Sequence, residues 1–321
     1  MAMTTKLTFG EHSFSCADGQ TVLDCLTANG VAIPSGCRSG VCQTCLMSAS
    51  AGDIPARAQD GLSAAQLEQR CFMACVCRPV SDLTVALPTA VRRKLSARVT
   101  AILPLNGDIL GVQLLPGEPF SYRAGQFINL YKDDSTSRSY SLASVPTLDA
   151  QLQLHVRKVP GGLVSGWIFD QLRCCDSVTI SEPSGDCIYT AGQPEQNLLL
   201  IGTGSGLAPL YGVIRDALSQ GHRGQIRLYH GAYQANGLYL VEALRALSKR
   251  HPNFSYTPCL SGGAATEGCR HGMVLDVALQ DLPNLAGWRV YLCGNPAMVE
   301  AAKPAVFLAG ASMREIFADP F

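Results

Sequence analysis

The stretch Cys37-Arg-Ser-Gly-Val-Cys42-Gln-Thr-Cys45 decides how the N-terminal part of the chain folds, and a fourth cysteine, Cys75, follows after 29 further residues. Four thiolates at C-x4-C-x2-C…C spacing are the ligand set of one class of [2Fe-2S] cluster, with three ligands on a single loop. Gly36 and Gly40 flank this loop, where glycine lets the backbone fold closely and direct N–H groups toward the sulfurs. The spacing therefore predicts four metal ligands: Cys37, Cys42, Cys45 and Cys75.

Two other interpretations of these cysteines stay open at this point. A zinc site commonly uses two short C-x2-C pairs, whereas this chain has one such pair, Cys42 and Cys45. The cysteines could also be buried structural thiols. The ligand pattern favours the iron-sulfur cluster over both.

Composition limits the class of protein. The chain has 321 residues, which predicts two or three domains, and its formal net charge is zero with no basic stripe for nucleic acid. No apolar run approaches the roughly 20 residues that span a bilayer, and the N-terminus lacks the apolar core of a signal peptide. Fourteen cysteines in a chain of this length fit reduced thiols. We therefore expect a cytoplasmic protein that binds neither nucleic acid nor membrane.

The first predicted domain comprises residues 1–88. Apolar-polar alternation and a helix stop at Asn29-Gly30 predict these elements: strands 6–9, 12–16, 46–49 and 82–87, and a helix over 20–30. With the ligand spacing, the segment resembles a plant-type ferredoxin of the β-grasp fold. That family commonly has glycine between the second and third ligands, where this chain has Gln43. The difference implies altered surroundings for the cluster.

Residues 89–96 are predicted to be an interdomain linker, because Pro88 interrupts the pattern and Arg92-Arg93-Lys94 follows. The basic run is either a solvated charge run or a contact with the first domain. Residues 97–192 then contain short strands separated by turns, which predicts a small antiparallel barrel. The predicted strands are 97–103, 109–115, 126–131, 151–157 and 177–181.

A second motif, Arg138-Ser139-Tyr140-Ser141, lies within this barrel. Arginine can pair with a phosphate, a tyrosine ring can cover a flavin, and serine can bond a ring or ribitol oxygen. Gly161-Gly162 precedes a predicted helix over 163–172, whose free N–H groups would suit a pyrophosphate. An ordinary ion pair and a core tyrosine are the alternative interpretation of Arg138 and Tyr140.

Together these features resemble the flavin domain of the ferredoxin-NADP reductase superfamily. The resemblance implies FAD rather than FMN, because the FMN-binding branch carries its ferredoxin part at the C-terminus. It implies the following flavin contacts: Arg138, Ser139, Tyr140, Ser141, His155, Arg157, Gly162 and Ser165.

The third predicted domain comprises residues 193–321. An almost wholly apolar strand over 197–202 runs into Gly202-Thr203-Gly204-Ser205-Gly206 and a helix with Pro209 near its start, the unit that cradles a pyrophosphate. Further strands and helices alternate, which predicts a parallel, doubly wound sheet. They are expected at 225–231, 238–249, 254–259, 288–293 and 297–309. The glycine spacing resembles the nucleotide loop of the same superfamily and implies Gly202, Thr203, Gly204, Gly206 and Pro209 as contacts.

The end of the strand over 288–293 resembles the C-G-x-P element of the superfamily. The resemblance implies Cys293, Gly294 and Pro296 beside the nicotinamide, although a buried structural thiol is the alternative for Cys293. A terminal aromatic can stack on the flavin in this superfamily, which implies Phe321, with Phe317 as the second choice. Catalytic roles are therefore implied for Cys293, Phe321 and Ser141.

The donor is expected to be NADH, with NADPH possible, because residues 231–239 contain neither arginine nor an acid for the ribose. The whole chain resembles the reductase component of bacterial aromatic-ring-hydroxylating dioxygenase systems. The resemblance implies an oxidoreductase that passes electrons from NADH through FAD and a [2Fe-2S] cluster to a separate terminal oxygenase or ferredoxin in aromatic hydrocarbon catabolism. Alternatives are a reductase for a diiron monooxygenase or a deoxysugar dehydratase, a non-enzymatic iron-sulfur redox sensor, and a zinc-stabilised binding module.

Overall fold

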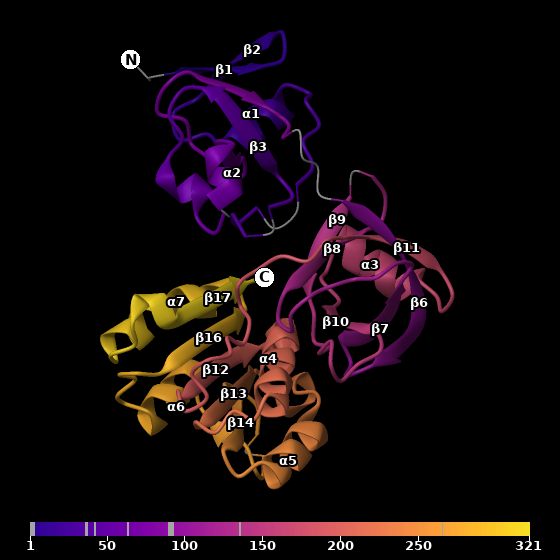
Figure 1. Ribbon diagram of the computed structural model, residues 1–321, viewed down its shortest axis with the longest axis vertical. Coiled ribbons are helices and arrows are strands. Elements are labelled where there is room, and N and C mark those ends of the chain that lie inside the picture. The colour runs from indigo at the N-terminus through magenta and orange to yellow at the C-terminus, as the bar shows by residue number, and fades with distance from the viewer. Residues whose placement is uncertain are drawn as a thin grey trace. The chain divides into compact units, whose positions relative to one another are not determined.

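The computed structural model describes residues 4–35, 38–41, 43–62, 64–88, 93–134, 136–264 and 266–321. The chain divides into two compact units (Figure 1). The first contains the residues up to Lys94 together with Asn129–Ser139, and the second contains Leu95–Ile128 and Tyr140–Phe321. Among the described residues, no helix has the length and apolar character needed to span a bilayer.

The first unit contains a mixed five-stranded sheet in the order β2-β1-β5-β3-β4, in which β1 runs parallel to β5 and antiparallel to β2. Its strands are β1 Thr5–Phe9, β2 His12–Cys16, β3 Leu46–Ala51, β4 Cys71–Met73 and β5 Leu83–Ala86. Its helices are α1 Val22–Ala28 and α2 Ala64–Glu68, with a 3-10 turn over Ala56–Gln59. The arrangement confirms the predicted ferredoxin-like fold.

Helix α1 begins where the sequence supplies a cap. The Thr21 hydroxyl accepts a hydrogen bond from the Asp24 N–H at 3.1 Å, which satisfies one of the free donors of the first turn. The helix ends at Ala28 with Asn29 as its C-cap, and Gly30 has a φ of +79°, a conformation that glycine adopts at little cost. Val22, Leu23, Cys25 and Leu26 of α1 are buried in the core of this unit.

The barrel sheet has six strands in the order β10-β7-β6-β11-β8-β9. The strands are β6 Lys94–Pro104, β7 Ile109–Pro116, β8 Phe127–Tyr131, β9 Ser137–Ser141, β10 Leu152–Arg157 and β11 Ser177–Ser181, and α3 covers Leu163–Asp170. Strand β9 carries the Arg138–Ser141 motif. Strand β6 already begins at Lys94, within the stretch that the sequence assigns to the linker. The sheet confirms the predicted barrel class.

The nucleotide-domain sheet is parallel throughout, in the order β15-β14-β13-β12-β16-β17. The strands are β12 Leu198–Thr203, β13 Ile226–Ala232, β14 Phe254–Leu260, β15 Arg270–His271, β16 Arg289–Gly294 and β17 Ile316–Pro320. The helices are α4 Leu207–Ser219, α5 Val241–Arg250, α6 Val274–Asp281 and α7 Pro296–Leu308. The doubly wound prediction is confirmed, and α6, β15 and β17 are additions to it.

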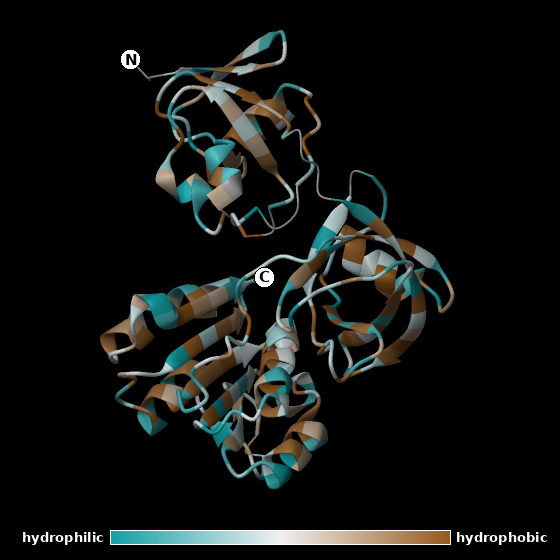
Figure 2. Ribbon diagram, in the orientation of Figure 1, coloured by the Kyte–Doolittle hydropathy of each residue, from teal (hydrophilic) through white to brown (hydrophobic). Residues whose placement is uncertain are grey.

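The two faces of this sheet are covered by different helices. Residues of α4 and α5 share one apolar cluster with the sheet, and residues of α6 and α7 share another (Figure 1). Strand β12 is buried from Leu198 to Gly202, as expected of a central parallel strand, and such strands appear brown in Figure 2. In the register, Gly202 lies between His230 of β13 and Cys293 of β16. The carboxyl ends of three strands therefore meet at one sheet edge, where ligands bind in folds of this kind.

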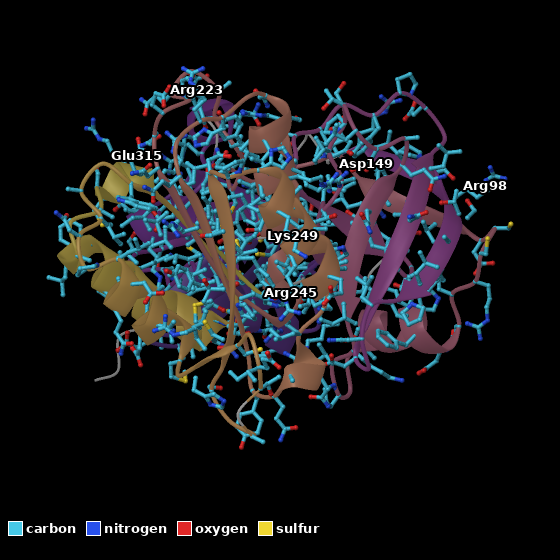
Figure 3. All side chains as sticks on the ribbon, turned by 90° about the horizontal axis from the view of Figure 1, so that it is seen from below. Arg98, Asp149, Arg223, Arg245, Lys249 and Glu315 are labelled. Carbon is cyan, nitrogen blue, oxygen red and sulfur yellow. The ribbon has the colours of Figure 1, made fainter. Side chains whose placement is uncertain are left out.

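An ion pair joins the barrel to the nucleotide domain within the second unit. The two guanidinium nitrogens Nη1 and Nη2 of Arg215, on α4, donate to the two carboxylate oxygens of Asp149 at 2.8 and 2.9 Å. The side chains of Arg215 and Asp149 are 18% and 25% exposed, so the pair is largely shielded from water. Asp149 is labelled in Figure 3. The neighbouring carboxylate raises the pKa of Arg215, against the opposing effect of burial.

Replacing Asp149 by asparagine should lower the free energy of unfolding of the second unit by about 2–3 kcal/mol, because a shielded, bidentate, charge-assisted contact is lost. Urea unfolding followed by tryptophan fluorescence reports on this unit, since both tryptophans, Trp167 and Trp288, belong to it. The control is Glu195→Gln, which breaks the exposed pair with Arg223 and should cost less than about 1 kcal/mol. Equal effects of the two changes would contradict the prediction.

Candidate active site

The two predicted cluster ligands that the structure describes lie next to each other. Cys45 and Cys75 are buried, and the Cys75 N–H donates to the Cys45 Sγ at 3.4 Å. An amide directed at a ligand sulfur is the kind of contact that tunes a thiolate cluster. The other two predicted ligands, Cys37 and Cys42, lie outside the described residues. The donor set and this contact fit an iron-sulfur cluster.

Gln43 adopts a left-handed backbone conformation, with φ at +52°. Residues other than glycine adopt this region at a cost, which gives a physical reason for glycine at this point of a ferredoxin loop. The side chain is held in place, because its Nε2 donates to the Gly61 carbonyl at 3.0 Å and its Oε1 accepts from Gln66 at 3.0 Å. These two bonds offset part of the backbone cost.

The guanidinium of Arg138 is exposed on β9 and donates to the Ser137 carbonyl at 2.8 Å. No carboxylate of the described residues forms an ion pair with it. Its neighbour Ser139 donates from Oγ to the Asn129 Oδ1 at 2.7 Å, while Tyr140 is half-buried. An arginine without a carboxylate partner is suited to an anionic ligand.

A hollow of about 600 Å³ opens at the start of α3. Its lining combines glycines with charged side chains: Asp108, Arg157, Lys158, Val159, Pro160, Gly161, Gly162, Gly166 and Asp170. The buried Ser165 shapes this loop, since its Oγ accepts from the Val159 N–H at 3.2 Å. A Cβ on Gly162 would lie 2.5 Å from that oxygen, so the loop requires glycine there. Both cations are paired within the lining, Arg157 with Asp108 and Lys158 with Asp170, so it is the glycines at the helix start that suit a phosphate-bearing cofactor.

The predicted flavin contacts on β10 face the nucleotide domain. The Arg157 Nε donates to Asp108 at 2.9 Å, and its Nη1 lies 3.4 Å from where a Cβ on Gly204 would stand. His155 is buried, and its Nδ1 lies 3.1 Å from the Tyr239 hydroxyl. Burial lowers the pKa of His155 to about 3, so the ring is neutral near pH 7.

The predicted nucleotide loop closes against the end of β16 with no room for side chains. A Cβ on Gly206 would lie 2.3 Å from the Cys293 carbonyl oxygen, and one on Gly294 would lie 2.4 Å from the Thr203 carbonyl oxygen. The Thr203 Oγ1 accepts from the Asn295 N–H at 3.1 Å. Gly204–Gly206 form a 3-10 turn, and α4 follows with Pro209 in its first turn. The loop therefore presents backbone at the sheet edge.

Cys293 is fully buried, and its Sγ lies 3.4 Å from the Sγ of Cys187, a neighbour that the sequence does not indicate. Burial is the main cause that raises the pKa of the Cys293 thiol well above its usual value. The thiol therefore stays neutral at physiological pH. Pro296 is the first residue of α7, and the Asn295 side chain caps that helix.

The C-terminal strand brings a buried carboxylate to the same place. Asp319 of β17 pairs in register with Cys293, and the Ser141 hydroxyl of the barrel donates to its Oδ2 at 3.2 Å. Asp319 and Ser141 are both 6% exposed. Phe321 is 43% exposed, and its N–H donates to the Gly294 carbonyl at 2.9 Å. Phe317, in contrast, stacks on Tyr291 with ring centroids 5.5 Å apart.

Three family models match the chain in succession. The 2Fe-2S iron-sulfur cluster binding domain matches residues 8–80, the oxidoreductase FAD-binding domain matches residues 105–189, and the oxidoreductase NAD-binding domain matches residues 200–304. The chain thus has domains for a [2Fe-2S] cluster, FAD and a nicotinamide nucleotide, and it is an oxidoreductase.

Curated relatives match over nearly the whole chain. The aromatic O-demethylase reductase subunit of an Amycolatopsis species is 34% identical, over 99% of each protein. The reductase component of the naphthalene 1,2-dioxygenase/salicylate 5-hydroxylase systems of a Ralstonia species is 35% identical, over 94% of each. The chain belongs to the family of reductase components of aromatic oxygenase systems. The crystal structure of the Amycolatopsis cytochrome P450 reductase GcoB, also 34% identical, agrees with this reductase at a TM-score of 0.70 over 99% of each chain.

Two residues at the candidate active site of this reductase escape sequence reasoning. Asp319 is separated from Ser141 by 178 positions, and Cys187 is separated from Cys293 by 106. Only the fold brings such pairs together. A signal for Asp319 does exist, because it is the acidic residue in the otherwise apolar stretch Ile316–Pro320 near Phe321. No comparable signal marks Cys187.

Ser141→Ala and Asp319→Asn should each slow flavin reduction by NADH about tenfold to a hundredfold, because a hydrogen bond to a carboxylate is worth about 1.5–3 kcal/mol. The double variant should be no slower than the slower single variant, since the two groups form one contact. Stopped-flow absorbance under anaerobic conditions measures the rate, and bound FAD should stay at the wild-type level. Multiplicative losses in the double variant would show that the two residues act separately.

Proposed function

We propose that this reductase takes electrons from NADH and delivers them, through FAD and the [2Fe-2S] cluster, to the oxygenase component or ferredoxin of an aromatic-ring dioxygenase system. One observation carries the catalytic part of the proposal. Ser141 from the barrel meets Asp319 beside Cys293, at the sheet edge where the nucleotide loop ends. A flavin held by the barrel would therefore lie here beside a nicotinamide held by the nucleotide domain.

The flavin side of the site is assigned to the barrel, for which we propose residues 97–192. The exposed guanidinium of Arg138 and the N–H groups at Gly162 would hold the pyrophosphate. Tyr140 and Ser141 would contact the ring system, with Ser139, Ser165, His155 and Arg157 around them. The glycines that line the hollow at the start of α3 support this placement.

The nucleotide side is assigned to residues 193–321. The backbone of Gly202, Thr203, Gly204 and Gly206 would cradle the pyrophosphate, and α4 begins immediately after this turn, with Pro209 in its first turn. Cys293, Gly294 and Pro296 would lie at the nicotinamide, where the neutral Cys293 thiol adds no charge beside the transferred hydride. Phe321 would cover the flavin ring. The loop after β13 carries no cation for a 2′-phosphate, which supports NADH as the donor.

The ferredoxin domain, for which we propose residues 1–88 with a linker over 89–96, would hold the cluster through Cys37, Cys42, Cys45 and Cys75. When bound, FAD would supply two-electron hydride chemistry and the cluster would supply one-electron transfer. The protein contributes placement: the Cys75 amide donates to a ligand sulfur, and the chain keeps both carriers on one polypeptide.

The class of oxygenase that accepts the electrons is a separate part of the proposal. Relatives that are 33% identical include reductase components named for naphthalene 1,2-dioxygenase and for phenol 2-monooxygenase of Pseudomonas species. These names support electron delivery to an oxygenase over a redox-sensor role. Reconstitution with a purified Rieske-type dioxygenase and, in parallel, a diiron monooxygenase would distinguish the two acceptor classes. A cytoplasmic location is proposed from the sequence alone.

Anaerobic titration of the purified protein with NADH should bleach both the flavin and the iron-sulfur absorption bands. More than two electrons should be taken up per chain, because both carriers fill. NADPH should require a higher concentration for the same bleaching, since the loop after β13 offers its extra phosphate no cation. Bands that respond to neither nucleotide would contradict the proposed function.

Two substitutions should separate the carriers. Arg138→Ala should lower FAD content per chain after purification, whereas Arg98→Ala, an exposed arginine on β6 of the same barrel, should leave it unchanged (Figure 3). Cys75→Ser should remove the native cluster, measured as iron and sulfide content, and leave flavin reduction by NADH intact. Normal FAD content in Arg138→Ala would refute the pyrophosphate role of Arg138.

A further inference from the structure

Tyr239 is a buried tyrosine of the nucleotide domain whose hydroxyl forms a hydrogen bond with the flavin barrel. It is 2% exposed and lies near the end of the loop that joins β13 to α5, residues 233–240. Its hydroxyl oxygen lies 3.1 Å from the Nδ1 of His155, a barrel residue that is 3% exposed. The two rings meet edge to face, with centroids 5.3 Å apart. The end of the β13–α5 loop is thus anchored on strand β10.

A second hydrogen bond from the barrel reaches the same loop. The Asn106 Nδ2, in the turn between β6 and β7, donates to the Gly237 carbonyl at 3.2 Å. The other end of that amide is also occupied, because its Oδ1 accepts from the Asp108 N–H at 3.1 Å. Asn106 is therefore oriented by its own turn and presents a fixed donor. Gly237 ends the 3-10 turn Ala235–Gly237, in the middle of the β13–α5 loop.

The start of the β13–α5 loop is held by the nucleotide domain itself. The Gly262 N–H donates to the Tyr233 carbonyl at 2.9 Å, and His230 of β13 meets the Tyr239 ring edge to face, with centroids 5.6 Å apart. The Tyr239 ring therefore contacts a histidine from each domain. Burial lowers the pKa of His155 to about 3 and that of His230 to about 4, so both rings are neutral at pH 7. No charge has to be desolvated to make this contact.

The anchored loop stores backbone strain. Leu240, directly after Tyr239, has a left-handed conformation with φ at 54°, which costs a residue with a side chain about 1–2 kcal/mol. Such strain persists only where the surroundings over-determine the conformation. Here the two barrel bonds before Leu240 and helix α5 after it supply that constraint. Without the barrel bonds, we expect the β13–α5 loop to relax.

The position of the β13–α5 loop gives the anchoring a function. Strand β13 lies beside β12, and Gly231 pairs in register with Thr203 of the nucleotide loop. Loops that leave neighbouring parallel strands at this edge contact the ribose of a dinucleotide in folds of this type. The β13–α5 loop is therefore placed to receive the adenosine half of the donor, and the barrel determines its shape.

We propose that His155 and Asn106, although they belong to the flavin barrel, are positioning residues for the adenosine half of the pyridine nucleotide: they hold the β13–α5 loop through Tyr239 and Gly237 in its binding conformation. The inference rests on the proposed NADH-dependent function. It assigns the His155 side chain to the nucleotide domain and leaves its backbone available to the flavin. Loss of the anchor lowers the fraction of molecules whose loop is competent, and apparent affinity falls in proportion to that fraction.

The test uses Tyr239→Phe, His155→Leu and Asn106→Ala in the full-length protein with FAD bound. Anaerobic stopped-flow flavin reduction gives the apparent Kd and the limiting rate for NADH and for reduced nicotinamide mononucleotide, which lacks the adenosine half. Each variant should raise the Kd for NADH about fivefold to tenfold, the loss expected for one hydrogen bond. In Tyr239→Phe and Asn106→Ala, the limiting rate and the Kd for the mononucleotide should stay within about twofold of wild type.

The chain offers a matched control. Tyr189 and His222 form the same kind of pair, with the hydroxyl and Nδ1 3.2 Å apart and the ring centroids 5.5 Å apart, outside the β13–α5 loop. Tyr189→Phe should therefore leave the Kd for NADH unchanged. The double variant Tyr239→Phe/His155→Leu should have a Kd for NADH no higher than that of the weaker-binding single variant, because the two residues form one hydrogen bond.

Three outcomes would overturn the proposal. The Kd for NADH could stay at the wild-type value in both Tyr239→Phe and His155→Leu. It could rise together with that for the mononucleotide, which would mean general distortion. FAD could be lost from His155→Leu alone, which would make the side chain a flavin contact. If the wild-type flavin is not reduced by NADH at all, the proposed function fails, and that result is distinct from an unchanged Kd in the variants.

Discussion

The active site depends on one steric constraint, the contact of two glycine turns at the carboxyl edge of the nucleotide sheet. Gly206 faces the Cys293 carbonyl and Gly294 faces the Thr203 carbonyl at distances that leave no space for a Cβ. Any larger residue would push β16 away from the nucleotide loop, and β17 pairs with β16 along its length. Asp319 and Phe321 reach the site only through that pairing. The absence of a side chain at Gly206 and at Gly294 thus determines where the Asp319 carboxylate and the Phe321 ring lie.

The junction between barrel and nucleotide domain combines apolar packing, in which Ile109 and Leu105 of the barrel join the apolar cluster of α4 and the sheet, with directional polar contacts. Asp149 and Arg215 form a shielded ion pair, and His155 and Tyr239 form a buried neutral hydrogen bond. Desolvation offsets much of what such contacts contribute to stability, so their main effect is to fix the orientation of the elements that they join. Apolar packing alone could slide, whereas the bidentate pair holds α4, and the oriented hydroxyl holds the β13–α5 loop, against the barrel. Hydride transfer requires such placement, because small displacements of the reacting atoms cost rate.

The features that the sequence predicted correctly are those that depend on residues close together in the chain. The cysteine spacing, the apolar strand Leu198–Thr203 and the glycine turn after it each follow from a few neighbouring residues, and the domain classes follow from them. Helix α5 shows the limit of this reasoning. Its apolar pattern extends back to Leu238, yet the helix begins at Val241, because Tyr239 is drawn to the barrel and Leu240 takes a left-handed conformation. Asp319 and Cys187 were not predicted for the same reason, since their partners are distant in sequence.

Strand β10 shows that a resemblance can assign a residue to the right strand without indicating which way its side chain points. Successive side chains on a strand point to opposite faces, so Leu154 and Val156 share one face and His155 and Arg157 share the other. Leu154 and Val156 are buried as barrel residues. His155 contacts Tyr239 and Arg157 approaches Gly204, so the second face belongs to the nucleotide domain. With a flavin bound as proposed, such a strand would serve the flavin through its backbone and the nucleotide through its outward side chains. One strand would then hold both partners of the hydride transfer, and this would couple the position of the donor to the position of the acceptor.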